Sequence, residues 1–187
     1  MIEQEVNPPL STRIITRGLS LITGPWRHWF DDEKYKVIVA SALNICVHQH
    51  KLDIAGYLIT ERRVFLVLRI DKDRIPGMLD KFSEYLEAEI RYQKVPVWNA
   101  PPTRPIAIKN GSPFNGLFEV FVLRNELLKK LLTGRQIPYP YSPQVARLKK
   151  RVSNYNFCSV MDYEGAQGPV KISRLPKEKV ITITERP

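Results

Sequence analysis

Two helical patterns enclose two consecutive strand patterns in the first half of the chain, and this order limits the fold more than any other feature. From Glu33 to about Gln49, apolar residues recur at helical spacing on one stripe. Leu52 to Ile59 and Val64 to Ile70 are predicted strands, and the polar stretch between them is short enough for a hairpin. A second helical stripe runs from about Asp73 to Tyr92, with Asp73 as its expected N-cap.

Further elements are predicted on either side of this core. Ser11 to Leu21 alternates loosely enough for a first strand, which the pair Gly24-Pro25 would end. Residues 95–108 hold four prolines and favour a loop or edge strands. A third helix is predicted from Phe114 to Leu132, ended by Gly134. Six of its residues are available for burial: Leu117, Val120, Phe121, Leu127, Leu128 and Leu131.

The order β-α-β-β-α, with later strands and a third helix, predicts an α+β fold: a ferredoxin-like sandwich, in which helices pack on an antiparallel sheet. Beyond it, Ile137 to Pro143 alternates with proline and predicts a stiff linker. A short basic helix is expected around Gln144 to Ser153, and a last strand at Val180 to Thr184. We therefore predict one domain over residues 1–135 and a proline-containing linker with a basic C-terminal extension over residues 136–187.

The charge balance favours a polyanionic partner. The 187 residues include 29 lysines and arginines against 19 acids, a formal net charge of +10. Such a field attracts nucleic acid, although a basic protein that merely stays soluble is the competing interpretation. No window approaches the ~20 apolar residues that cross a bilayer, and the N-terminal residues do not resemble a signal peptide. We expect a cytoplasmic protein with no membrane partner.

The cysteines and histidines predict neither a disulfide nor a metal site. Cys46 and Cys158 belong to no paired motif and are expected to be buried free thiols. His48 and His50 form a His-x-His triplet, but it closes a helix, where side chains two residues apart point about 200° apart. Cations near a helix C-terminus are explained by the helix dipole. No cofactor-binding fingerprint is present.

The stretch from Leu21 to Arg91 contains a recognisable series of short motifs in a fixed order. Its markers are Trp29-Phe30-Asp31-Asp32, the helical Ala40-Ser41-Ala42-Leu43, and the hairpin segment from Asp53 to Leu68. In the order and residue pattern of these motifs, this stretch resembles the His-hydrophobic-His single-tyrosine transposases. That family includes insertion-sequence enzymes and relatives associated with repetitive extragenic palindromes. The resemblance implies a ferredoxin-like fold, DNA as the partner and pairing as homodimers.

The residues that would cut DNA are missing from the matching positions. The two metal-binding histidines of the family fall on Arg63 and Phe65, and neither side chain can ligate a cation. The predicted third helix contains no tyrosine to serve as nucleophile. Tyr155, which follows three basic residues, is the remaining weak candidate, and a packed tyrosine is the ordinary alternative. We expect no cleavage activity.

Two basic regions remain as candidates for nucleic-acid binding. At the hairpin, Arg62 and Arg63 are placed to meet phosphate directly, unless they are only a solvated turn. A second region has eight cations against the single acid Glu126, a formal charge of +7: Arg124, Lys129, Lys130, Arg135, Arg147, Lys149, Lys150 and Arg151. It also contains Tyr139 and Tyr141, which would suit stacking on single-stranded bases, although a linker that packs on itself would look the same.

Three functions stay open at this point. One is a catalytically degenerate transposase-like domain that binds hairpin or single-stranded DNA. Another is a protein-interaction module on the same scaffold, anchored by exposed Trp26, Trp29 and Trp98. A nuclease with an unrecognised site is a third, which cleavage assays with Mg²⁺ or Mn²⁺ would reveal.

Overall fold

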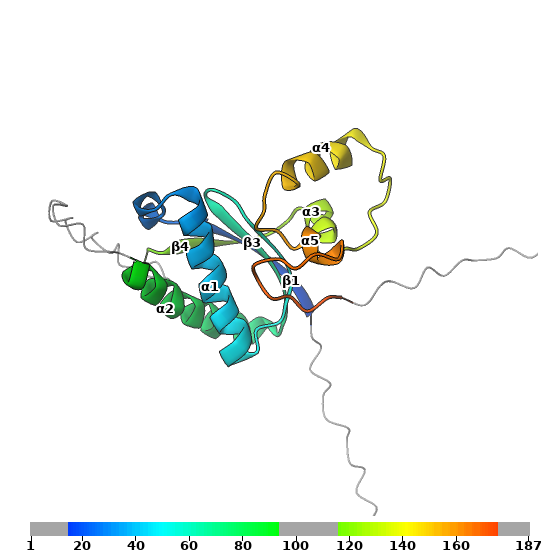
Figure 1. Ribbon diagram of the computed structural model, residues 1–187. Helices are drawn as coiled ribbons and strands as arrows, with labels where there is room; N and C mark the ends of the chain where they lie inside the picture. Colours follow the sequence, from blue (N-terminus) through cyan, green and yellow to red (C-terminus); the bar gives the residue numbers. More distant parts are fainter. Residues whose placement is uncertain (1–14, 94–115, 176–187) are drawn as a thin grey trace, which may run out of the picture.

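A four-stranded antiparallel sheet forms the centre of the computed structural model, which describes residues 15–93 and 116–175 (Figure 1). The strand order is β2-β3-β1-β4, so the hairpin β2-β3 lies at one side and the last strand at the other. The strands are β1 (Ile15–Thr23), β2 (Ile54–Ile59), β3 (Arg63–Ile70) and β4 (Phe118–Val122).

Two long helices cover one face of this sheet: α1 (Asp32–His50) and α2 (Ile75–Gln93). Short 3-10 turns precede them, η1 (Pro25–Trp29) before α1 and η2 (Lys72–Arg74) before α2. The apolar stripes of both helices join the alternate residues of the strands in a first hydrophobic cluster. With the order β1-α1-β2-β3-α2-β4, the structure confirms the predicted α+β, ferredoxin-like fold.

The start of α2 differs from the prediction. Asp73 does not cap the helix, because it lies inside η2, whose N-cap is Asp71, and α2 begins at Ile75. By contrast, α1 begins as its sequence indicates: the Asp31 side chain accepts a hydrogen bond from the backbone N–H of Lys34 at 2.8 Å.

The predicted third helix from Phe114 to Leu132 is wrong over its first half. Residues Phe118–Val122 form β4, which pairs antiparallel with β1, and only Glu126–Leu132 is helical, as α3. The strand forms because β1 offers a free edge, and its burial then alternates: Phe118 is buried while Phe121 is 49% exposed. Asn125 starts α3 by accepting a hydrogen bond from Leu128 N–H, and Gly134 follows the helix at φ 60°.

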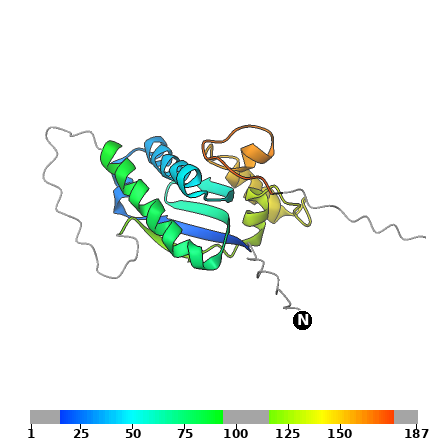
Figure 2. The ribbon, with the colours of Figure 1, turned by 90° about the horizontal axis from the view of Figure 1, so that it is seen from below.

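The second face of the sheet is covered by α3 and by two helices that follow it, α4 (Pro143–Val152) and α5 (Val160–Tyr163) (Figures 1 and 2). Here α3 lies on a cross-strand row in which Val67 pairs with Gly18 on one side and Gly56 on the other. A Cβ atom at Gly56 would lie 2.4 Å from the carbonyl oxygen of Leu132. The glycines therefore let the helix backbone come against the strands.

The C-terminal segment wraps the free edge of β2. Backbone hydrogen bonds join Ile59 N–H to Phe157 O, Ser159 N–H to Tyr57 O, and Ser173 N–H to Ile54 O. All six residues of β2 are consequently buried, although β2 is a border strand of the sheet. Phe157 and Val170 belong to the first cluster, whereas Val152 and Cys158 belong to the second.

This packing bears on the proposed division at residue 135. Residues from both sides of that position share both hydrophobic clusters, so the described part of the C-terminal extension is packed onto the sheet. The boundary itself stays a prediction. The predicted linker is non-helical from Ile137 to Ser142, whereas Pro143 is the first residue of α4, which confirms the predicted basic helix. The predicted strand Val180 to Thr184 lies outside the described residues.

Candidate nucleic-acid interface

The hairpin between β2 and β3 presents Arg62 and Arg63 to solvent, since both residues are exposed. Their backbones are fixed from both sides. Thr23 donates from its N–H and its hydroxyl to Arg62 O, both at 3.1 Å. The Thr60 hydroxyl donates to Arg63 O and its N–H donates to the same carbonyl at 2.8 Å. The turn therefore projects two cations from a rigid base.

Arg27 is a further anchor of this turn, which sequence reasoning missed. It is buried, and its Nε donates to the carbonyl of Glu61 at 2.6 Å. Its guanidinium also pairs with Asp32 and lies 4.4 Å from the ring centroid of Tyr35. The only local signal is its place in the aromatic run around Trp26, which marks packing but not a buried cation.

Arg63 and Phe65, which stand where the transposases that the sequence resembles carry histidines, differ in their exposure to solvent. Arg63 and Phe65 lie two residues apart on β3 and so share the second face of the sheet. Arg63 is exposed, whereas Phe65 is half-buried and packs against the second cluster, together with Tyr155 and Leu148. This face is thus partly covered by the C-terminal helices, and only the arginine end reaches solvent.

Tyr155 and the two cysteines, which could act as nucleophiles, pack against the protein. Tyr155, the weak nucleophile candidate, is half-buried against the second cluster. Both cysteines are buried, as predicted, and burial raises the pKa of Cys46 to about 12 and that of Cys158 to about 11. Thiols with such pKa values stay protonated at neutral pH and are poor nucleophiles.

Within residues 15–93 and 116–175, no group of three histidine, cysteine or acidic side chains is placed to hold a metal ion. His48 and His50 have separate surroundings. His50 Nε2 lies 2.8 Å from the hydroxyl of Tyr85 on α2, while His48 is exposed on the outer side of α1. The same described stretches include no helix suited to crossing a membrane.

The two tyrosines of the linker, Tyr139 and Tyr141, are exposed to solvent. Tyr139 is 83% exposed and Tyr141 is 97% exposed, so neither ring packs against the protein. Tyr139 adopts a left-handed backbone conformation with φ 54°, which is costly for a residue with a Cβ atom, and its carbonyl accepts from Ser142 N–H at 3.0 Å. The linker thus forms a defined turn with both rings directed outward, and the self-packing interpretation does not apply to these rings.

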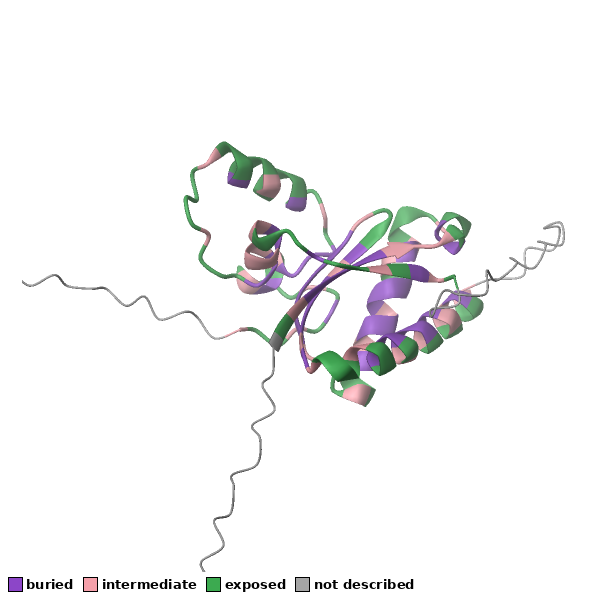
Figure 3. Cartoon of the chain, turned by 180° about the vertical axis from the view of Figure 1, so that it is seen from behind, coloured by how far each residue is buried: buried purple, intermediate pink, exposed green. Residues whose placement is uncertain are grey.

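Helix α4 adds a cationic face beside the linker. Its inner stripe of Val145, Leu148 and Val152 packs toward the protein, and Figure 3 shows the helix green along the rest of its surface. The exposed side of α4 carries the four basic residues that were predicted to bind nucleic acid: Arg147, Lys149, Lys150 and Arg151. No acid lies on α4, so this charge is not offset within the helix.

The cations around α3 are less uniform. Lys129 Nζ lies 2.6 Å from Glu126 Oε1, so its charge is partly compensated, and Lys130 is half-buried. Arg124 and Arg135 are exposed at the two ends of the helix. Of these residues, Arg135 is brought together with Lys149 of α4, because both line one pocket beside the linker. We call residues 135–151 the basic arm.

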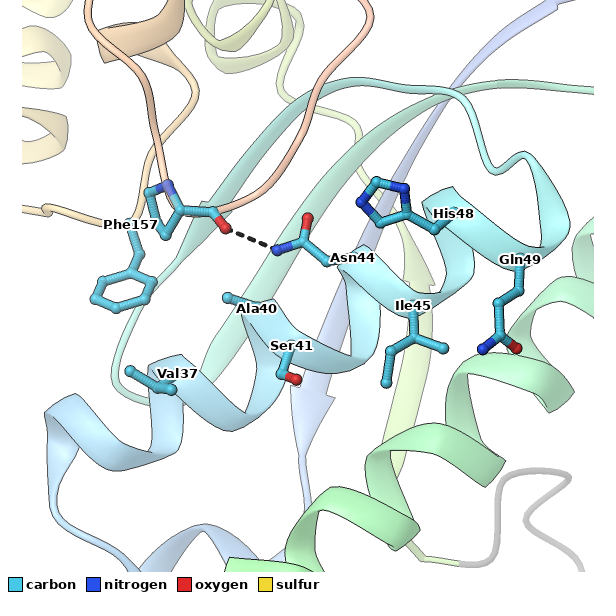
Figure 4. Close-up of a pocket in the computed structure, with 9 residues that line it drawn as sticks. Val37, Ala40, Ser41, Asn44, Ile45, His48, Gln49 and Phe157 are labelled. Atoms are coloured by element: carbon cyan, nitrogen blue, oxygen red, sulfur yellow. Dashed lines mark hydrogen bonds between the residues drawn. The ribbon is translucent and has the colours of Figure 1, made fainter.

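A second hollow lies on the outer side of α1 (Figure 4). It has a volume of about 460 Å³ between α1 and the C-terminal segment, with Phe157 on one side and His48 near one end. Asn44 lines it and joins α1 to the C-terminal segment, because its side chain donates to Pro169 O at 2.8 Å and accepts from Lys171 N–H at 2.9 Å. The hollow therefore lies beside the Asn44 hydrogen bonds that fasten the C-terminal segment to α1.

The tryptophans do not form the exposed set that protein binding was expected to use. Trp26 is buried, with 2% of its surface exposed. Its Nε1–H donates to Leu117 O at 2.7 Å, and its ring centroid lies 5.5 Å from that of Tyr35. Trp29 is 40% exposed, and Trp98 lies outside the described residues.

Comparison of the chain with models of known families, with curated proteins and with solved structures gives no match.

Proposed function

We propose that this protein is a catalytically degenerate transposase-like domain that binds hairpin or single-stranded DNA. The observation that carries the proposal is the exposure of Tyr139 and Tyr141 inside the basic arm. Exposed rings stack on bases, and exposed cations follow the phosphates of the same strand. Arg62 and Arg63 supply a second, rigidly held pair of phosphate contacts, and DNA is also the partner that the transposase resemblance implies.

Cleavage is not part of the proposal. Arginine and phenylalanine replace the metal ligands at positions 63 and 65, and the described tyrosines near the arm are either bare on the linker or half-buried, as Tyr155 is. Pairing as a homodimer is proposed on the resemblance; it is compatible with β4, a border strand whose Phe121 and Val122 are 49% and 69% exposed.

Fluorescence anisotropy with labelled hairpin and single-stranded oligonucleotides at ~0.15 M salt tests the proposal. We expect the logarithm of the affinity to fall linearly with the logarithm of the salt concentration. Replacing both Tyr139 and Tyr141 with alanine should weaken single-strand binding about tenfold or more, since each stacked base contributes about 1–3 kcal/mol.

Charge reversal has a matched control. Arg62→Glu with Arg63→Glu should weaken binding at least tenfold and flatten the salt dependence, as should reversal of Lys149, Lys150 and Arg151. Lys72→Glu with Arg74→Glu makes the same change of charge at two exposed cations on η2 and should have a much smaller effect. Equal losses in the two double variants would mean that only net charge matters, and unchanged affinity in every variant would count against the proposed interface.

The rival function, a protein-interaction module, keeps one described anchor, Trp29. Absence of binding to every oligonucleotide at ~0.15 M salt would favour it over DNA binding.

A further inference from the structure

A pocket lies where the basic arm meets the body of the protein. It has a volume of about 540 Å³, within the range of small-molecule sites, and is bounded by the end of α3, the linker, α4 and α5. Ile137 and Pro140 line it, and they flank Tyr139 in the chain. One wall of the pocket is therefore the same linker that presents the bare tyrosines. We call it the linker pocket.

The inner surface of the linker pocket is mainly apolar, with side chains from four separate segments: Leu131, Ile137, Val160 and Leu175. Its two hydroxyl groups are already engaged. Thr133 Oγ1 donates to Lys129 O at 2.7 Å. The hydroxyl of Tyr163 donates to Ala55 O at 2.7 Å and accepts from Leu175 N–H at 3.2 Å. Polar recognition therefore falls to the exposed Gln136 and to the charged groups at the rim.

Those charged groups are two cations and one acid. Arg135 and Lys149 are exposed and line the pocket from the end of α3 and from α4, and the exposed Glu164 lines it from the end of α5. Lys149 has no ion-pair partner among the residues that the structure describes. Burial raises the pKa of Tyr163, whereas the hydrogen bond from Leu175 N–H and the positive charges of Arg69, Arg135 and Arg174 act in the opposite direction. Two further cations, Arg69 and Arg174, therefore lie within electrostatic range of the Tyr163 hydroxyl.

We propose that the linker pocket takes one unstacked nucleotide of the strand that the basic arm binds. The base lies against the apolar surface, Arg135 and Lys149 hold its phosphate, and the carboxylate of Glu164 accepts a hydrogen bond from an exocyclic amino group. This inference rests on the proposed DNA binding and adds a base preference to it. Cytosine and adenine offer an exocyclic amino donor, whereas thymine has a carbonyl oxygen at the corresponding place, which the carboxylate repels, so thymine is disfavoured.

Anisotropy of the full chain with labelled oligo-dC and oligo-dT of equal length tests the preference. We expect dC to bind at least fivefold more tightly than dT. Glu164→Ala should bring that ratio close to one. Glu119→Ala, which removes an exposed acid on β4 away from the pocket, should leave the ratio unchanged. Because the two oligomers also differ in stacking, the change of the ratio on substitution is the diagnostic quantity.

A second variant fills the pocket without changing charge. Val160→Trp should weaken dC binding at least fivefold while the salt dependence stays as in the parent protein, because the cations of the basic arm are intact. Circular dichroism checks that this variant is folded; if it is not, Glu164→Ala alone decides, since Glu164 is exposed.

The outcomes separate the two proposals. If no oligonucleotide binds, the proposed function and the pocket assignment fail together. If both oligonucleotides bind with full dependence on Tyr139 and Tyr141, yet Glu164→Ala leaves the dC to dT ratio unaltered, the pocket assignment alone is overturned.

Discussion

Arg27 shows how one buried residue holds the hairpin arginines in place. Besides its bond to Glu61 O, it donates from Nη1 to Phe30 O at 2.9 Å and pairs with Asp32. These contacts join η1, the start of α1 and the hairpin turn. Removing the guanidinium leaves the carbonyl oxygens of Glu61 and Phe30 without this donor, a cost that a neutral side chain of similar length does not recover. The Asp32 carboxylate, whose side chain is 53% exposed, is solvated by water instead.

We therefore expect Arg27→Met to lower the free energy of unfolding by about 2–4 kcal/mol, measured by urea denaturation. Arg91→Met is the control: Arg91 is an exposed arginine that pairs with Glu87 on the same helix, and its loss should cost no more than about 0.5 kcal/mol. At temperatures where Arg27→Met stays folded, its hairpin-DNA affinity should also fall. An equal, small destabilisation in both variants would show that Arg27 does not anchor the turn.

At the scale of elements, the two sides of the sheet use different packing. The face under α1 and α2 is a conventional layer of large apolar side chains, whereas α3 lies on the row Gly56–Val67–Gly18. A Cβ atom at Gly18 would lie 2.7 Å from Lys129 Cε, which is the end of a flexible side chain, but at Gly56 it would meet backbone. The position of α3, and with it the pocket at its end, therefore depends on Gly56.

Gly56→Ala should destabilise the protein by about 1–3 kcal/mol, because the added methyl group must push the last turn of α3 away from β2. Gly77→Ala is a matched control: nothing lies within 4 Å of its Cβ position on α2, so it should be neutral or stabilise by up to about 1 kcal/mol. Thermal denaturation of both variants measures the difference. Two variants of equal stability would contradict the close approach.

The elements also show what local sequence determines. α1, α2 and the hairpin were predictable, because each buries one stripe or face and the pattern repeats over many residues. β4 was not, because Leu117, Val120 and Phe121 have helical spacing, and only pairing with β1 makes the segment a strand. The basic residues of the candidate site were visible in the sequence. Its pocket was not, since Val160 and Glu164 reach the linker only through the fold.

At the scale of the whole molecule, the C-terminal segment completes the body of the protein. It covers the edge of β2 by three backbone hydrogen bonds, supplies Phe157 and Val170 to the first cluster, and is clamped by Asn44. An uncovered β2 would present unpaired N–H and C=O groups along an apolar strand, which favours aggregation. The linker, by contrast, runs over the surface with both tyrosines exposed. Residues from both sides of the linker therefore share one core, whereas the linker itself is exposed to solvent.

Cutting the linker should leave the molecule assembled. If a specific protease site is inserted after Tyr141 and cleaved, the two fragments should co-elute in size-exclusion chromatography at ~10 μM, because residues from both fragments interdigitate in both clusters. They should separate only in urea, together with loss of the folded state. Single-strand affinity should fall on cleavage even so, since the cut frees the ends of the segment that holds the tyrosine rings in place.

Spontaneous separation of the cut fragments, with residues 1–141 remaining folded, would instead make position 135 a true domain boundary. The C-terminal part would then be an accessory that the sheet does not require. The two outcomes differ in where the DNA-binding surface resides. In an assembled molecule, the arm, the hairpin arginines and the linker pocket share one rigid support, and substitutions in all three should alter the same binding isotherm. In a separable one, the fragment that starts at Ser142 would keep the α4 cations but lose both tyrosines, and its remaining affinity would be purely electrostatic and lost in high salt.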